Sequence, residues 1–106
     1  MRFTWLGHNC WQIGLANRTL LVDPFLDDSP TAPVKADDVA CDEILISHGH
    51  YDHISDAVAI ATRTGAPVFA NFEVGEWLKK QGVAESQIQP MNLGGGVDTD
   101  WGRVTI

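Results

Sequence analysis

From residue 43 to residue 92 the sequence alternates short apolar runs with segments whose apolar residues recur at helical spacing. A short apolar run bounded by turn residues is typical of a buried strand, and apolar residues three and four positions apart favour a helix. Asn71 is a favourable N-cap, and Gly65 and Gly82 are typical residues at which helices end. We therefore expect strands at 43–47, 67–70 and 88–92, separated by helices at 54–64 and 71–81. This order predicts an α/β fold.

The segments on either side of this region have a different pattern. Aromatic and branched residues at 2–6, 10–15 and 19–22 predict strands, the last two joined by a hairpin turn. Prolines and aspartates interrupt any periodicity in residues 24–42, which predicts a long surface loop with one helical turn near Asp37. We expect the glycines at 94–96 to form a turn before a last strand at 101–106.

Size and charge limit the classes of function. The chain has 106 residues, 14 of them acidic and 7 basic, with a formal net charge of −7, so we expect a single domain over residues 1–106. Its basic residues are scattered, which argues against nucleic acid as a partner. No run approaches the roughly 20 apolar residues of a membrane helix, and no export signal is visible. We expect no membrane partner, a cytoplasmic location, and reduced Cys10 and Cys41 in the core.

Residues 48–53 form the sequence His-Gly-His-Tyr-Asp-His, which holds three of the four histidines of the chain. The segment lies between a predicted strand and a predicted helix, where ligand sites of α/β proteins gather. In an extended chain His48 and His50 point to one side and can share one ion. Imidazole and carboxylate together suit zinc, manganese or iron. The motif therefore predicts a metal site, the alternative being a solvated loop with incidental histidines.

This motif resembles the His-x-His-x-Asp-His signature of the metallo-β-lactamase superfamily. Other segments, among them Trp-Leu-Gly-His-Asn-Cys, Leu-Leu-Val-Asp-Pro-Phe and Pro-Met-Asn-Leu-Gly-Gly, are similar to uncharacterised metal-dependent hydrolases related to ascorbate-6-phosphate lactonase. The resemblance extends over the whole chain. It implies half of an αββα sandwich, with a mixed β-sheet and helices on one face.

The resemblance also implies site residues. One metal ion would be held by His48 and His50, and a second by Asp52 and His53. Asp52, Asp23 and His8 would belong to the catalytic site. Asp23 matches an aspartate that braces the metal-binding loop, although an aspartate that only begins an Asp-Pro turn is the alternative. His8 lies where related proteins have a histidine facing the active-site cleft, although a structural histidine is equally compatible with the sequence.

The chain departs from the superfamily in its length. The superfamily domain joins two halves of this kind, and its remaining metal ligands have no counterpart here, so the resemblance implies an N-terminal half. A structural zinc takes four protein ligands and a catalytic zinc three, whereas each site here has two. We therefore expect two divalent ions, zinc before manganese or iron, to bind weakly, and the isolated chain to be inactive.

Two functions are compatible with these expectations. The first is half of a metal-dependent hydrolase, in which metal-activated hydroxide attacks an ester, lactone or phosphoester of a small molecule. The second is a non-catalytic half-domain that associates with a second copy or with a complementary C-terminal half. The substrate is not identified by the sequence, because the loops and the residues without a counterpart here determine it.

Overall fold

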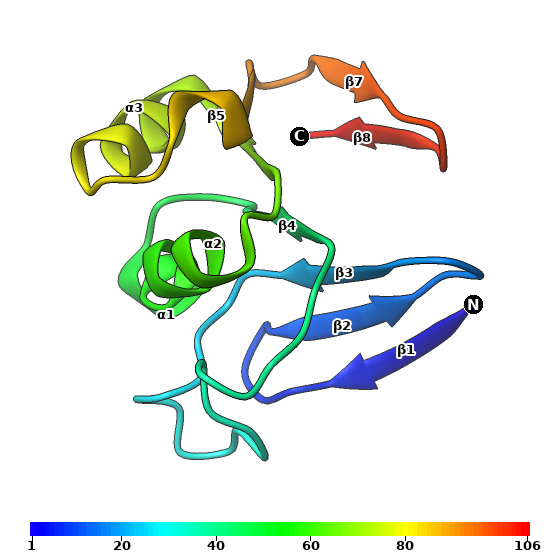
Figure 1. Ribbon diagram of the computed structural model, residues 1–106, viewed down its shortest axis with the longest axis vertical. Coiled ribbons are helices and arrows are strands. Elements are labelled where there is room, and N and C mark those ends of the chain that lie inside the picture. Colours follow the sequence, from blue (N-terminus) through cyan, green and yellow to red (C-terminus); the bar gives the residue numbers. More distant parts are fainter.

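The computed structural model describes residues 1–106 and contains a six-stranded mixed sheet with its helices on one face (Figure 1). The strands lie in chain order: β1 (Arg2–Trp5), β2 (Trp11–Gly14), β3 (Thr19–Val22), β4 (Glu43–Leu45), β5 (Val68–Asn71) and β6 (Ile88–Met91). Neighbours from β1 to β3 are antiparallel, and neighbours from β3 to β6 are parallel. The helices are α1 (Tyr51–Ile54), α2 (Ala57–Thr64), α3 (Phe72–Lys80) and the 3₁₀ helix η1 (Glu85–Gln87). The predicted α/β fold with a mixed sheet is confirmed.

The main core lies between the sheet and the helices. Directly paired residues point to the same face of a sheet. One row of register partners crosses the four parallel strands and is buried along its length: Leu21, Ile44, Val68 and Ile88. On the helix side, Ile60 of α2 and Leu78 of α3 are fully buried in the same cluster. Apolar helix faces and buried strands thus close one core, as the periodicity predicted.

The opposite face of the sheet is partly covered by a hairpin of β7 (Gly96–Asp98) and β8 (Arg103–Thr105). The Trp101 indole N–H donates to both carboxylate oxygens of Glu43, at 2.9 and 2.8 Å, and its ring packs edge-on against Phe69. Arg18 donates to Glu43 at 2.5 Å and to Asp100 at 2.7 Å. These bonds hold the hairpin against strands that are distant in sequence.

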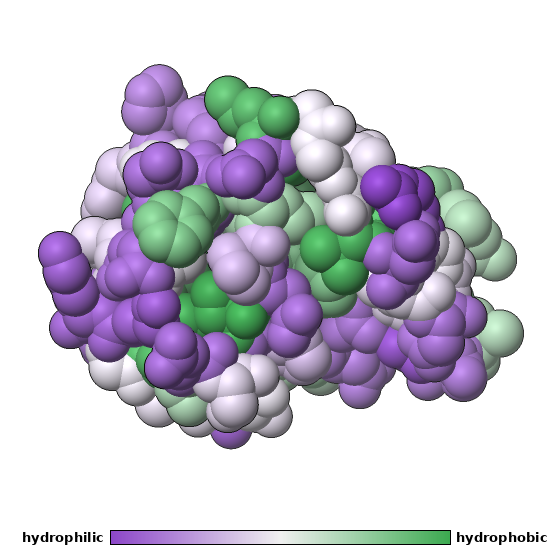
Figure 2. Space-filling view, turned by 90° about the horizontal axis from the view of Figure 1, so that it is seen from above, coloured by the Kyte–Doolittle hydropathy of each residue, from purple (hydrophilic) through white to green (hydrophobic).

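Much of this second face remains open and apolar. A groove of about 400 Å³ lies between hairpin and sheet, lined by Leu45, Phe69 and Val104 among others. The face continues over β1 and β2, where the register partners Trp5 and Trp11 are 52% and 40% exposed. Figure 2 views the molecule from the end where α3 and the hairpin lie, and at this end apolar side chains are interspersed with polar ones. No element of the chain covers this surface completely.

Four details differ from the sequence-based expectations. The helix expected at 54–64 is divided into α1, which starts inside the histidine motif, and α2. Ser55 and Asp56 separate them, because the Asp56 N–H donates to the Pro24 carbonyl at 3.1 Å instead of continuing the helix, and the Asp56 carboxylate accepts the N–H groups of Leu26 and Asp27. Gly96 begins β7 rather than completing a turn, and the last strand is confined to β8. η1 was not expected from the sequence.

The segment from 24 to 42 is an irregular loop, as expected. Its one helical turn lies where the sequence places it, with the Val39 N–H donating to the Lys35 carbonyl at 3.2 Å. Arg63 of α2 donates to the carbonyls of Ala36 and Val39, at 2.7 and 2.6 Å. These bonds fix the loop against the helix layer.

Both cysteines are free, and Cys10 is fully buried while Cys41 is partly buried. Burial raises the pKa of Cys10 to about 11, so this thiol remains protonated. None of the helices is both long and apolar enough to cross a membrane.

Asn71 caps α3, since its side-chain oxygen accepts the Val74 N–H at 2.8 Å. Asn71→Ala is expected to lower the free energy of unfolding by about 1 kcal/mol, because an N-terminal N–H of the helix loses its partner. Urea denaturation measures this change. Asn71→Asp retains the acceptor oxygen and should cost much less, so equal destabilisation by both substitutions would contradict the capping role.

Candidate metal centre

The candidate residues meet at one edge of the sheet. β1 and β3 are both antiparallel to β2 and therefore run in the same direction, which is also that of β4. The carboxyl ends of these three strands consequently lie at the same edge. His8 follows β1, Asp23 follows β3, and the motif at 48–53 follows β4. Sheet topology thus brings together residues from three separate segments.

His48 and His50 form one pair of potential ligands. His48 Nε2 lies 3.1 Å from His50 Nδ1, and the ring centroids are 4.7 Å apart. Two nitrogens bound to one zinc ion at 2.0–2.1 Å are separated by about 3.3 Å, so this spacing fits a shared ion. The other ring nitrogen of His48 lies 2.8 Å from the Ser47 hydroxyl, which fixes the orientation of the ring.

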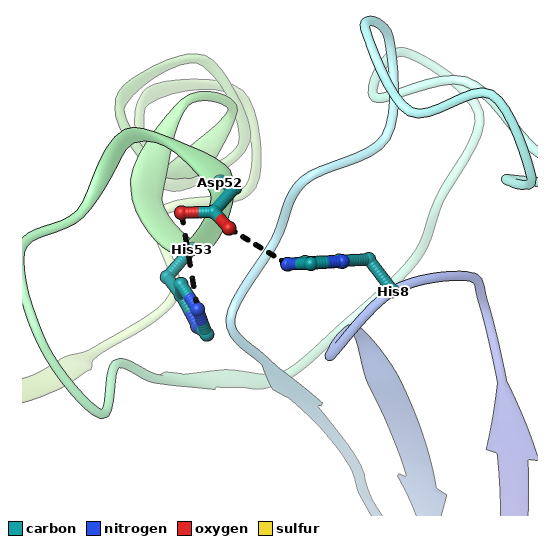
Figure 3. A group of neighbouring side chains, drawn as sticks. All are labelled: His8, Asp52 and His53. Atoms are coloured by element: carbon teal, nitrogen blue, oxygen red, sulfur yellow. Dashed lines mark hydrogen bonds and ion pairs between the residues drawn. The ribbon is translucent and has the colours of Figure 1, made fainter.

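Asp52 lies between His8 and His53, as Figure 3 shows. Its Oδ2 is 2.8 Å from His8 Nε2, and its Oδ1 is 3.9 Å from His53 Nε2. One ligand atom from each of the three residues lies within 4.8 Å of the other two. The hydrogen bond with His8 holds the pKa of Asp52 below its usual range, which favours the ionised carboxylate that metal binding requires. These side chains therefore form a second group of potential ligands.

The two groups are adjacent. The rings of His48 and His53 have centroids 4.0 Å apart. Whereas His8 and Asp52 are roughly half exposed, His53 is buried. The arrangement is an open site whose inner wall is formed by His53.

Asp23 lies beneath both groups and is only 4% exposed. Its Oδ2 is 2.8 Å from His53 Nδ1 and accepts the Ser47 hydroxyl at 2.6 Å, while its Oδ1 accepts the Ser47 N–H at 2.7 Å. Because Nδ1 of His53 is hydrogen-bonded to the Asp23 carboxylate, the Nε2 atom of His53 faces Asp52. Asp23 has a positive φ of 46°, an uncommon conformation for a residue other than glycine. The carboxylate orients His53 directly and His48 through Ser47.

Sequence reasoning did not single out Ser47, Tyr51 or Asp56. Ser47 joins Asp23 to His48, and its position directly before the motif is the signal that could have identified it. The Tyr51 hydroxyl donates to Asp28 and Asp56 binds the backbone after Phe25, so both tie the long loop to the site. No local pattern predicts these contacts, because the partners are 23 and 30 residues apart.

A sequence model of the beta-lactamase superfamily domain matches residues 2–101. The chain belongs to this family. The UPF0173 metal-dependent hydrolase of Methylacidiphilum infernorum is 46% identical over 105 residues, which cover 98% of this chain and 46% of that protein. The UPF0173 metal-dependent hydrolase of Thermoplasma volcanium is 47% identical over 90 residues, covering 85% and 40%. The chain thus spans about half the length of the curated relatives it matches.

Solved structures have the same fold. Igni18, a metallo hydrolase from Ignicoccus hospitalis, matches with a TM-score of 0.79 and 29% identity over 92% of this chain and 42% of that one. The isothiocyanate hydrolase from Delia radicum gut bacteria matches with a TM-score of 0.69 and 16% identity, over 94% and 44%. The similarity to the metallo-β-lactamase fold expected from the sequence is therefore confirmed.

Proposed function

We propose that the chain is the N-terminal half of a metal-dependent hydrolase domain that acts on an ester, lactone or phosphoester of a small molecule. The observation that supports this most strongly is that two groups of potential ligands converge at one sheet edge. Within each group the ligand atoms lie close together, and the rings of His48 and His53 make the two groups adjacent. The names of the relatives, which are metal-dependent hydrolases, agree with it.

The donor set fits two divalent ions, with zinc favoured over manganese or iron because imidazole nitrogens predominate. His48 Nε2 and His50 Nδ1 would hold one ion, and Asp52 and His53 Nε2 the other. Such ions, when bound, supply the Lewis acidity that activates water and polarises a carbonyl or phosphoryl group. The chain's own contribution is orientation: Ser47 fixes the ring of His48, and Asp23 fixes His53 in a buried position.

A complementary C-terminal half is the partner that this proposal requires. The chain spans 46% of the Methylacidiphilum relative, and two ligands for an ion are fewer than a catalytic zinc takes. The open face with the groove beside Leu45 and the exposed Trp5 and Trp11 is apolar, as a surface that another layer covers would be.

The free thiols of Cys10 and Cys41 fit a reducing compartment, so we place the protein in the cytoplasm.

Complementation tests this function. The chain is coexpressed with the part of the Methylacidiphilum relative that it does not match, and the purified complex is assayed with zinc or manganese against a generic phosphodiester and a lactone. We expect hydrolysis that needs both polypeptides and is lost on chelation. A complex that assembles and binds both ions but hydrolyses neither substrate class would contradict the proposal.

The open face also supports a second candidate function, a non-catalytic half-domain that pairs with a second copy of itself. Two copies related by a two-fold axis could cover each other's exposed aromatic residues, among them Trp5 and Trp11. Sedimentation of the purified chain distinguishes the two candidates. A dimer that binds no metal would favour this function, and a monomer would exclude it.

A further inference from the structure

His8 is presented by a turn with positive φ at two successive residues, 94° at Gly7 and 50° at His8. Gly7 is required there, because a Cβ would lie 2.7 Å from the Thr31 hydroxyl oxygen. The turn is fixed by two hydrogen bonds: the Trp5 indole N–H donates to the His8 carbonyl, and the Cys10 N–H donates to the Gly7 carbonyl, both at 2.9 Å. His8 is therefore held in a conformation that residues other than glycine seldom adopt.

This backbone places the imidazole against the candidate metal centre. His8 Nε2 is 2.8 Å from Asp52 Oδ2, and the ring meets those of Phe25 and His53 edge-on, each at 5.6 Å between centroids. The ligand atoms of His8, Asp52 and His53 lie within 4.8 Å of one another. The separations of about 3.3 Å between ligand atoms around one zinc ion lie within the range that these three side chains already span, 2.8 Å from His8 to Asp52 and 3.9 Å from Asp52 to His53.

We propose that His8 is the third protein ligand of the ion assigned to Asp52 and His53, an inference that rests on the proposed function. Two imidazole nitrogens and one carboxylate oxygen, with a position left open for water, form the ligand set of a catalytic zinc site. The 106-residue chain thus contains one complete set within itself. The pair His48 and His50 needs further ligands from the complementary half.

A hydrogen bond to Asp52 alone does not explain the geometry. The side chains of His8 and Asp52 are 42% and 45% exposed, and exposed ion pairs contribute little to stability. Such a bond gives no reason for a histidine to retain a positive φ. A bound ion supplies that reason, because strained conformations persist where a functional geometry depends on them.

The test uses the chain with His48→Ala and His50→Ala, which leaves only the proposed three-residue site. This variant is titrated with Co²⁺, and proton NMR counts the imidazoles whose ring N–H signals show the large contact shifts of direct coordination to the ion. We expect two shifted imidazoles, from His8 and His53. Adding His8→Asn, a residue that tolerates positive φ, should remove one of them and weaken Co²⁺ binding by more than about 100-fold, beyond the 10–100-fold expected for an indirect partner.

Each other result overturns the inference in a recognisable way. If the variant with only His48→Ala and His50→Ala shows a single shifted imidazole, His8 is not a ligand. A loss of affinity below about 100-fold with no change in the shifted signals would mean that His8 only positions Asp52. If neither this variant nor the unmodified chain binds Co²⁺, the inference fails, whereas the proposed function, which needs the complementary half, is tested separately by the complementation experiment.

Discussion

The complemented domain with His48→Ala and His50→Ala is expected to bind one ion fewer than the unmodified complex and to lose hydrolysis by roughly 10³-fold or more. The reason is that the alanines remove both ring nitrogens that lie 3.1 Å apart at the first group. A metal ion stabilises a transition state by several kcal/mol, and each 1.36 kcal/mol corresponds to about a tenfold change in rate. Metal content per complex and kcat/KM measure the two effects.

Tyr51→Phe provides the matched control for the ion count. It changes the same segment and removes the hydrogen bond to Asp28, but it alters no proposed ligand atom. The Tyr51→Phe complex should therefore retain both ions. Full metal content in the double histidine variant would show that the first ion is held elsewhere.

The sequence predicted the fold well where the signal was local. The row Leu21, Ile44, Val68 and Ile88 is buried in strands that stand out as apolar segments between turn residues. The β7–β8 hairpin was only partly predicted, because it is stabilised by contacts distant in sequence. Arg18 and Asp100 are 82 residues apart and Glu43 and Trp101 are 58 apart, so no periodicity reveals them.

The candidate site divides in the same way. The spacing of His48 and His50 within one extended segment predicted that they could share an ion, and their nitrogens are adjacent in the structure. The contact of His8 with Asp52 spans 44 residues and depends on the parallel directions of β1 and β4. Sequence reasoning therefore placed His8 in the cleft by resemblance alone and assigned only two ligands to each ion.

Asp23→Asn is expected to leave the fold intact and to weaken metal binding in the complemented domain by about 10–100-fold. The side-chain amide can still accept the Ser47 N–H, but its NH₂ group then faces His53 Nδ1, where the carboxylate oxygen lay at 2.8 Å. His53 Nδ1 can accept a hydrogen bond from that NH₂ group only if the ring proton lies on Nε2. The Nε2 atom, which lies beside Asp52, then has no lone pair for a metal ion. Calorimetric titration with zinc measures the affinity, and urea denaturation checks the fold.

Asp38→Asn is the matched control, since Asp38 is an exposed aspartate of the long loop and has no proposed role in metal binding. It should change neither affinity nor stability. If Asp23 only begins a turn, asparagine favours the same turn geometry and Asp23→Asn should be equally silent. If Asp23 binds an ion directly, the substitution should cost a whole metal equivalent. An intermediate loss of affinity with both ions still bound at saturation is the result that follows from a buried carboxylate orienting His53 through Nδ1.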